Sequence, residues 1–296
     1  MIELRPCESD ADLEAWRSVR ISVVPYERTD SVEDLRRNIT PDRLMLLAYR
    51  DGRLAGSGVA GRGDTASGFA IPRVLTEHRR HGVGTAILYT LAEHVEGLGY
   101  PDLAVGADDE GSLAFARHFG FEEVGREVEQ VRAVGPDESW PGVPDRIEIV
   151  SLADVPGLHA RTYHELALAA FEDIPTPRKI QITLEDWERS WVPTLEGSFA
   201  ALAGDEIVGC AGLVRDADQS DRAENTLTAV RRDWRGRGLA RALKETVIAW
   251  ASENGVTELF TWTQTGNENM QAVNERLGYV TRNVSVRLRR PLPLSA

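Results

Sequence analysis

RRDWRGRGLARALK, residues 231–244, decides how the second half of this 296-residue chain folds. The stretch follows NTLTAV (225–230), whose alternating β-branched residues predict a strand. The apolar residues within and after it recur at helical spacing: Leu239, Leu243, Val247 and Trp250. A strand, a glycine-bearing loop and a helix together direct free backbone N–H groups and the positive end of the helix dipole toward one point. The glycines at 236 and 238 let an anion approach that backbone without meeting a Cβ atom.

This basic loop has two candidate ligands, a nucleic acid backbone and the phosphates of a small anionic cofactor. The formal net charge of −13 argues against nucleic acid, because nucleic-acid-binding domains are usually basic. A minor-groove arm would lie in basic surroundings, whereas this Arg-Gly-Arg begins a packed helix. The loop also lacks the Gly-Lys-[Ser/Thr] ending of a Walker loop and the G-x-G-x-x-G of a dinucleotide site. We therefore predict that it binds cofactor phosphates, with charge added by Arg235, Arg237, Arg241 and Lys244.

Composition narrows the class of protein. Hydrophobic residues make up 42% of the chain, and its length suffices for two globular domains. The acidic balance suits a cationic amine substrate, although many proteins are acidic for solubility alone. Cys7 and Cys210 have no metal or redox spacing, and the histidine pairs lack a third ligand, so we expect no metal and a reducing cytoplasm. No signal-peptide core or bilayer-length apolar stretch is present, which predicts a cytoplasmic protein without a membrane partner.

The two halves of the chain repeat one another. VLTEHRRHGVGTAILYTLAEHV (74–95) matches VRRDWRGRGLARALKETVIAWA (230–251), and a hairpin-like segment precedes each copy. Two copies of this length indicate a duplicated domain and not a solenoid. The segment 136–145 is rich in proline, glycine and acidic residues, as linkers are. We predict one domain over residues 1–135, this linker, and a second domain over residues 146–296.

At the loops the chain resembles a known family. Arg235-x-x-Gly238-x-Ala240 is similar to the acyl-CoA pyrophosphate loop of the GNAT superfamily of N-acetyltransferases, written [QR]-x-x-G-x-[GA], and RRHGVG (79–84) repeats the pattern. Each loop is surrounded by a hairpin, a strand, a helix and a closing aromatic tag, which is FGF at 119–121 and LGY at 277–279, so the resemblance covers nearly the whole chain. It implies an α/β (α+β) fold of two GNAT-like domains, each a mixed, mostly antiparallel sheet flanked by helices. It also implies acetyl-CoA as cosubstrate and the amine of a small molecule as acceptor.

The same resemblance implies most of the cofactor contacts. The acyl group would lie against the fourth strand of the second half, at residues 227–230, and pantetheine between that strand and TELFTWTQ (257–264). The implied cofactor-binding residues of the second half are Thr228, Ala229, Val230, Arg235, Gly236, Arg237, Gly238, Leu239, Ala240, Arg241 and Asn267. Those of the first half are Val74, Arg79, Arg80, Gly82, Val83 and Gly84.

Two residues of the second half stand at the family's catalytic positions. Glu224 takes the place of the general base and shares a face with Thr226, Thr228 and Val230 by the two-residue period of a strand. The alternative is a solvated glutamate near the strand end. Asn274 stands where the family has its general-acid tyrosine; an amide can donate a hydrogen bond to the leaving sulfur but cannot readily deliver a proton. For Asn274, as for Asn267, the alternative is helix capping.

The first half is expected to be structural or cofactor-binding, without catalysis. Gly68 stands at the position of Glu224, Ala116 at that of the acid, and Asp109 at that of the cofactor-contacting asparagine, while the loop motif is intact. For the acceptor, Glu172 and Asp173, fixed by nearby prolines, are candidates to pair with a cationic substrate. An exposed acidic turn is the alternative.

These residues predict direct attack of the amine in a ternary complex, because no cysteine lies near the motif to suggest a covalent intermediate. The protein is expected to be a monomer or a homodimer. Two other functions stay open. A non-catalytic acyl-CoA sensor or scaffold is favoured by the missing acid and the degenerate first half. A mycothiol-synthase-like enzyme fits the tandem arrangement, but the missing tyrosine counts against it.

Overall fold

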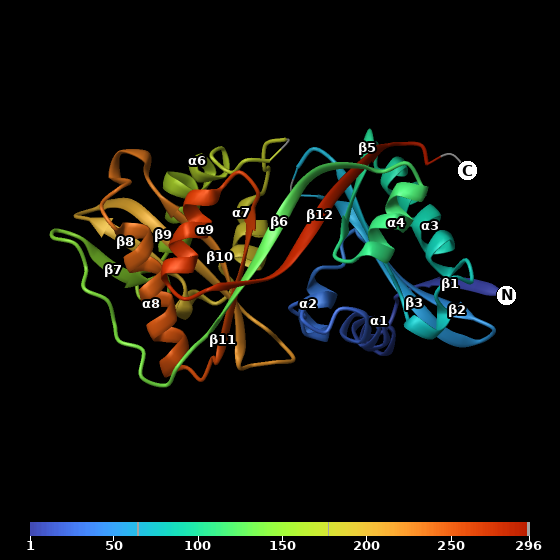
Figure 1. Cartoon of the computed structure of the whole chain (residues 1–296), viewed down its shortest axis with the longest axis horizontal. Helices are drawn as coiled ribbons and strands as arrows, with labels where there is room; N and C mark the ends of the chain where they lie inside the picture. The colour runs from blue at the N-terminus through green and yellow to red at the C-terminus, as the bar shows by residue number, and fades with distance from the viewer. Residues whose placement is uncertain (64, 177, 295–296) are drawn as a thin grey trace. The chain divides into compact units, whose positions relative to one another are not determined.

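The computed structural model describes residues 1–63, 65–176 and 178–294, which fold into two compact units (Figure 1). Unit 1 consists of Met1–Gly125 together with Ser285–Ala296, and unit 2 of Arg126–Val284. The division differs from the predicted boundaries at 135 and 146, because the segment before the linker and the end of the chain each belong to the other unit. The reason lies in how the two sheets are completed.

Unit 1 is built on a mixed sheet whose strands pair antiparallel from β1 to β4 and parallel from β4 to β5. The strands that originate in the first half are β1 (Ile2–Pro6), β2 (Leu44–Arg50), β3 (Arg53–Arg62), β4 (Gly68–Val74) and β5 (Asp102–Ala107). The helices are α1 (Asp10–Val23), α2 (Val32–Arg37), the 3₁₀ turn η1 (Thr76–His78), α3 (Val83–Gly97) and α4 (Glu110–His118).

Unit 2 repeats this plan, antiparallel from β7 to β10 and parallel from β10 to β11. Its strands are β7 (Glu148–Ser151), β8 (Phe199–Ala203), β9 (Glu206–Arg215), β10 (Arg222–Val230) and β11 (Glu258–Gln264). Between β7 and β8 come α5 (Leu158–Thr162), the π turn η2 (Tyr163–Ala167), α6 (Leu168–Phe171), α7 (Leu184–Asp186), the π turn η3 (Trp187–Trp191) and η4 (Leu195–Gly197). After β10 come η5 (Arg232–Trp234), α8 (Leu239–Glu253) and α9 (Glu268–Arg276).

The two units exchange their closing strands. β6 (Glu122–Ala133) follows α4 of the first half, yet its residues 127–133 pair antiparallel with β11 in unit 2. β12 (Val280–Pro291) follows α9, yet its residues 286–291 pair antiparallel with β5 in unit 1. The predicted linker also belongs to unit 2, where Trp140 Nε1 donates to Glu253 Oε1 at 2.6 Å. The amino-acid composition marks residues 136–145 as a linker. Composition does not decide which unit a closing strand joins, because that depends on strand pairing.

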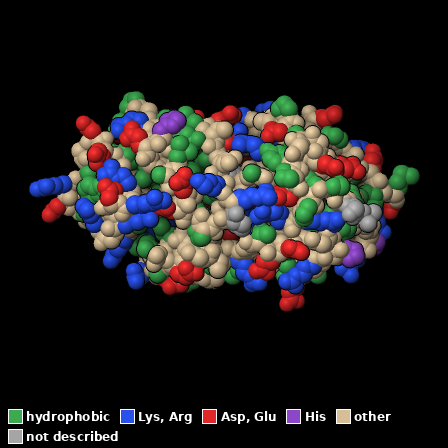
Figure 2. Space-filling model, turned by 90° about the horizontal axis from the view of Figure 1, so that it is seen from above, with side chains coloured by type: hydrophobic (Ala, Val, Ile, Leu, Met, Phe, Trp, Pro, Cys, Tyr) green, Lys and Arg blue, Asp and Glu red, His purple; other side chains and the backbone are tan. Residues whose placement is uncertain are grey.

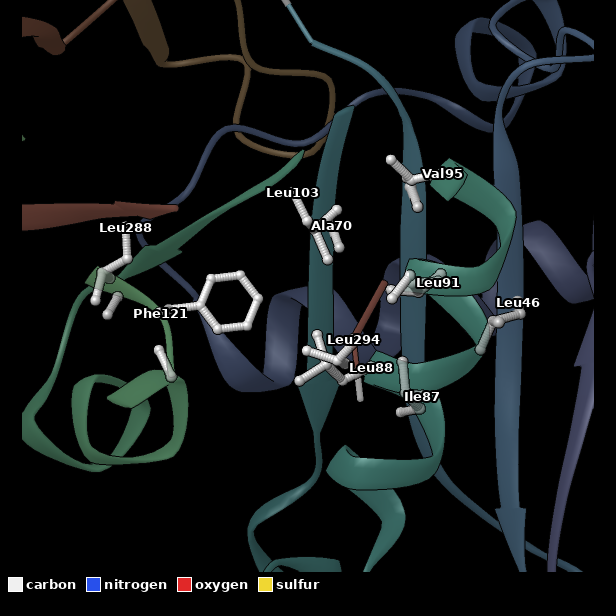
Figure 3. Close-up of a cluster of buried hydrophobic side chains, with 14 of the residues drawn as sticks. Leu46, Ala70, Ile87, Leu88, Leu91, Val95, Leu103, Phe121, Leu288 and Leu294 are labelled. Carbon is white, nitrogen blue, oxygen red and sulfur yellow. The ribbon is translucent and has the colours of Figure 1, made fainter. Parts of the chain in front are cut away.

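Each sheet is covered on both faces. In β2, Leu46 and Ala48 pack with the α3 core while Met45 and Leu47 pack with α1, as the alternation of side chains along a strand requires. Figure 3 shows the α3 side, where Ile87, Leu88 and Leu91 lie against the sheet. In β8, likewise, Phe199 and Ala201 face α8, and Ala200 faces the α5–η3 segment. The α/β fold class predicted from the sequence, with helices flanking mostly antiparallel sheets, is confirmed.

Charged side chains of both signs are interspersed over the face of the molecule shown in Figure 2. Within the described residues, no helix is long and apolar enough to cross a bilayer. No group of three or more His, Cys, Asp or Glu residues there is placed to hold a metal ion.

Candidate active site

In unit 2, strands β10 and β11 begin together and then part. Their parallel pairing joins Arg222–Glu224 to Glu258–Phe260, and in the described part of the chain it ends there. β10 continues beside β9 as far as Val230, and β11 continues beside β6 as far as Gln264. Residues 227–230 of β10 and the second half of β11 therefore have inner edges that do not pair with each other. This is where the resemblance to the GNAT superfamily implies that pantetheine binds.

A β-bulge interrupts β10 at the point of separation. Asn225 pairs with Leu213 and Thr228 with Ala211, so two residues, Thr226 and Leu227, oppose the single residue Gly212. The extra residue reverses the alternation of side chains. Ala223 packs with the α8 core before the bulge and Val230 after it, although the two differ in parity.

The bulge corrects one prediction. Glu224 and Thr226 precede the extra residue and lie on the face toward the α5–η3 segment, where Thr226 Oγ1 donates to the carbonyl oxygen of Trp191 at 2.6 Å. Thr228 and Val230 lie on the α8 face. The four residues therefore do not share a face, because the two-residue period holds only for a regular strand. Glu224 is half-buried on the face toward the α5–η3 segment.

The loop between β10 and α8 has the conformation that the glycines predicted. Gly236 has φ of 77° and Gly238, the N-cap of α8, has φ of 80°, in the left-handed region that favours glycine. The first internal hydrogen bond of α8 runs from Ala242 N–H to Gly238 O at 3.0 Å. In residues 236–241, no backbone N–H has a partner among the described residues. A Cβ atom at either glycine would meet no described atom within 4 Å. The loop therefore presents several N–H donors to open space, as an anion site requires.

The arginines of this loop already have partners within the chain. Arg235 Nε donates to Val230 O at 3.0 Å, and its Nη2 donates to Asp173. Arg232 donates to the same carboxylate, at 3.1 Å from its Nε to Oδ1. Arg237 lies over the Trp234 ring at 4.5 Å from its centroid, and Arg241 donates to Glu245 at 2.8 Å.

The structure thus places Asp173, a predicted acceptor-binding residue, against the predicted phosphate loop. Hydrogen bonds from Arg232 and then Arg235 hold the pKa of Asp173 at about 2. A carboxylate already neutralised by two guanidinium groups is a poor partner for a cationic substrate. Its neighbour Glu172 lies 3.6 Å from Lys179 Nζ, on the surface. A cofactor phosphate would compete with Asp173 for Arg235.

We expect Asp173→Asn to tighten coenzyme A binding by about two- to fivefold, since an exposed ion pair contributes at most about 1 kcal/mol. Because the pKa of Asp173 is lowered, the contact is fully present above pH 4 and weakens only as pH falls through about 2. Isothermal titration with coenzyme A at neutral pH measures the effect. Glu172→Gln, which removes the adjacent charge, is the matched control and should leave the Kd unchanged. Weaker binding by Asp173→Asn would contradict this account and show that Asp173 orients the arginines.

The two predicted asparagines occupy different settings. Asn274 is fully buried in α9, and its Nδ2 donates to Gln130 Oε1 of β6 at 2.9 Å. Its amide is thus directed toward the interior, as a structural group would be. Asn267 is the N-cap of α9, but no side-chain capping bond forms; its backbone carbonyl accepts from Met270 and Gln271 instead. Its half-buried side chain is compatible with the predicted cofactor contact.

Unit 1 repeats the loop and the separation of strands. Gly82, with φ of 81°, is the N-cap of α3, and Arg79 Nε donates to Val74 O at 3.2 Å, as Arg235 does to Val230 in unit 2. Arg80 has φ of 63° where unit 2 has Gly236. Within the described residues of unit 1, parallel pairing of β4 with β5 joins only Gly68–Phe69 to Leu103–Ala104.

The bulge, however, is specific to unit 2. In the described residues, β4 pairs with β3 in one continuous register from Gly56↔Val74 to Arg62↔Gly68. Because unit 2 has one extra residue, the position of Glu224 is taken by Phe69 and not by the predicted Gly68: Phe69 pairs with Ala104 as Glu224 pairs with Phe260. Neither residue is a base, so the expectation that this position carries no carboxylate is unaffected.

Two further residues of β4 distinguish unit 1, and the sequence reasoning missed both. Pro72 stands where unit 2 has Thr228, so the strand has no N–H donor there. Arg73, at the place of Ala229, is buried, with Nη2 2.5 Å from Glu27 Oε2, and lies over the Trp16 ring at 5.6 Å. The Arg73 side chain occupies the α1 face of β4, where Trp16 lies. The proline in FAIPRV was the available signal.

An open hollow in unit 1 lies apart from these features. It is lined by Tyr89, His118, Phe119, Gly120 and residues 290–293, and none of the predicted site residues contributes to it.

Comparison with known proteins agrees with this geometry. The Acetyltransferase (GNAT) family matches residues 11–121 and 160–279, which together make up more than half of the chain. The chain belongs to the GNAT acetyltransferase family. The two matched regions bear out the predicted tandem arrangement of GNAT domains. No curated protein matches the chain.

Solved structures support the tandem GNAT fold. A tandem GNAT protein from the clavulanic acid biosynthesis pathway aligns over 100% of both chains, with a TM-score of 0.80 and 19% identity. A GCN5-related N-acetyltransferase from Sphaerobacter thermophilus aligns over 98% of this chain and 95% of its own, with a TM-score of 0.76 and 21% identity. A glucosamine N-acetyltransferase region of a fungal β-N-acetylglucosaminidase covers 98% of this chain and 38% of that one, at a TM-score of 0.70 and 15% identity. At these identities the likeness concerns the GNAT fold alone.

Proposed function

We propose that this protein is an acetyl-CoA-dependent N-acetyltransferase that acetylates the amine of a small molecule, and that unit 2 performs the reaction. One observation carries the proposal: in unit 2 the donor loop, the parting of β10 from β11 and the bulge of β10 occur together. Unit 1 has the first two features and not the third within its described residues. We further infer a cytoplasmic enzyme that works as a monomer or a homodimer.

The residues present fit coenzyme A. The N–H groups of residues 236–241 and the positive end of α8 suit a diphosphate, and Arg235 can turn to it from Asp173. The free edge of β10 at residues 228–230 suits the amides of pantetheine. Bound acetyl-CoA would supply the activated acyl group. Backbone donors at the bulge, fixed in place before reaction, would stabilise negative charge that develops on its carbonyl oxygen.

Glu224 is the proposed general base. It belongs to the last paired register of β10 and β11, on the face toward the α5–η3 segment, from which the acceptor would enter. There it would take the ammonium proton directly or through water. Asn274 is turned toward Gln130, so we assign protonation of the leaving thiolate to water and not to this amide.

Direct attack of the amine is supported by the state of both cysteines. Burial raises the pKa of Cys210, in β9, to about 12, and it raises the pKa of Cys7 in unit 1 to about 12 as well. A thiol with so high a pKa is a poor nucleophile at neutral pH, because the thiolate is the reactive species. An acetyl-cysteine intermediate at either residue is therefore disfavoured, and a ternary complex is the simpler route.

The proposal is tested by incubating the full chain with labelled acetyl-CoA and a panel of small amines at neutral pH. We expect thiol release that depends on the amine, and a product 42 Da heavier than the amine by mass spectrometry, where about 42 Da is the mass added by acetylation. Tight coenzyme A binding without release would overturn the enzyme in favour of a sensor. Strongly salt-dependent retention on DNA would instead indicate a nucleic-acid partner.

A further inference from the structure

A lysine is buried in unit 2 behind the proposed acyl-binding strand. Lys244, on α8, is 2% exposed, and its Nζ donates to Asn225 Oδ1 of β10. Nζ also lies 5.3 Å from the centroid of the Tyr279 ring, which is itself buried. Desolvation lowers the pKa of Lys244 to about 7. Burying an ammonium group is costly, so the position calls for an explanation beyond packing.

Asn225 connects this lysine to the bulge. Its Nδ2 donates to Gly212 O at 2.8 Å, and Gly212 is the single residue opposite the two bulge residues Thr226 and Leu227. A bulge disrupts the ladder locally, and the amide of Asn225 supplies a donor to the carbonyl at that point. A chain of hydrogen bonds therefore runs from α8 through Asn225 to β9.

The bulge is also held from the opposite face. Thr226 Oγ1 donates to Trp191 O at 2.6 Å. A Cβ atom at Gly212 would come within 2.4 Å of Thr226 Oγ1 and 2.5 Å of Trp191 O, so no larger residue fits there. The backbone of residues 226–228 is thus fixed between α8 on one side and η3 on the other.

Unit 1 provides an internal comparison. The register of β4 puts Ala70 at the place of Asn225, since Ala70 pairs with Ala60 as Asn225 pairs with Leu213. Loop-to-helix spacing puts Leu88 at the place of Lys244, and the aromatic tag puts Phe121 at that of Tyr279. Figure 3 shows these three apolar side chains among those of the α3 core. The polar pair and the bulge therefore occur together in unit 2, and the corresponding described residues of unit 1 have neither.

We propose that Lys244 and Asn225 are positioning residues, which hold the bulge of β10 in the geometry that receives the acyl group. The inference rests on the proposed function, because it assigns the bulge a role in acetyl transfer. The prediction that Lys244 adds charge at the phosphate loop is wrong, because its side chain is buried against Asn225 and Tyr279. Among the described residues neither Lys244 nor Asn225 contacts the phosphate loop through its side chain, so they act on the chemical step and leave cofactor affinity alone.

Lys244→Leu, which introduces the residue of unit 1, tests the proposal. We expect kcat to fall about tenfold while the Kd for coenzyme A changes less than twofold, because a small displacement of reacting groups affects the chemical step most. The melting temperature should not fall, since an apolar side chain avoids the cost of a buried charge. Thr246→Val, which also replaces a buried polar side chain of α8 by an apolar one, is the matched control and should retain the wild-type kcat.

Two more variants separate positioning from general packing. Asn225→Asp keeps an acceptor for Lys244 but removes the donor to Gly212, so it should lose kcat as Lys244→Leu does. The double variant Lys244→Leu/Asn225→Ala should lose no more than either single variant, because residues that act as a unit are not additive. If the wild type is active, additive losses of kcat in the double variant would overturn the proposal. An unchanged kcat in Lys244→Leu would overturn it as well. So would parallel losses of coenzyme A affinity and melting temperature.

Hydrogen exchange provides a readout that does not depend on activity. The amides of residues 225–230 should exchange faster in Lys244→Leu than in the wild type, while those of the C-terminal half of α8 are unchanged. Unaltered exchange at the bulge would overturn the proposal even if the wild type proved inactive. An inactive wild type with faster exchange in the variant would instead refute the proposed function and leave the role of the pair in holding the bulge supported.

Discussion

Gly238→Val is expected to lower kcat/KM for acetyl-CoA by more than about 100-fold, whereas Gly82→Val lowers it less than about threefold. At Gly238 the added side chain enters the space where the proposed diphosphate approaches the N–H groups of residues 236–241. Loss of two charge-assisted hydrogen bonds, at about 1.5–3 kcal/mol each, accounts for a 100-fold effect or more. The effect follows only if unit 2 is the catalytic unit.

The two substitutions are matched in their cost to folding. Gly238 and Gly82 have φ of 80° and 81° and are the N-caps of α8 and α3, so a β-branched residue meets the same backbone strain at both. Steady-state kinetics, titration with coenzyme A and melting temperatures of both variants measure the difference. Loss of turnover in Gly82→Val with an intact Gly238→Val would reverse the assignment of the catalytic unit.

The loops could be predicted from the sequence because their conformation is a local property. Gly236 and Gly238 adopt positive φ, and the helix after them buries Leu239, Leu243 and Val247 at the predicted spacing. Glycine preference and helical period are both encoded in a few adjacent residues. The duplication was predictable for the same reason, since each copy repeats these local signals.

The bulge of β10 and the exchange of β6 and β12 could not be predicted in this way. A two-residue period assumes a regular strand, and nothing in the segment ENTLTAV by itself marks where one extra residue enters. The bulge depends on partners distant in the chain: Gly212 in β9, Trp191 in η3 and Lys244 in α8. Strand exchange likewise depends on pairing across 130 or so residues of chain, as between Phe260 and Val131. Local patterns carry little information on such contacts.

Glu224→Gln should lower kcat about 100-fold at pH 7, since general base catalysis typically contributes 10²–10⁴-fold and water can replace part of it. The glutamine keeps the size of the side chain and its place on the face toward η3, so coenzyme A affinity should be unchanged. The difference in kcat between Glu224→Gln and the wild type should also become smaller as pH rises toward the pKa of the acceptor amine, because more of the amine is then already deprotonated. Steady-state rates from pH 6 to pH 10 measure this recovery.

Glu245→Gln is the matched control, because it makes the same substitution at a glutamate of unit 2 that pairs with Arg241 on α8. It should retain kcat and leave the pH profile unchanged. A Glu224→Gln enzyme with wild-type kcat at pH 7 would show that the amine loses its proton to solvent before it binds. If the variant instead loses the same factor in kcat at every pH, Glu224 shapes the acceptor site and does not move the proton. Only a loss of kcat that becomes smaller as pH rises identifies the carboxylate as the base. At high pH the acceptor amine is already deprotonated, so the proton transfer to Glu224 is no longer needed.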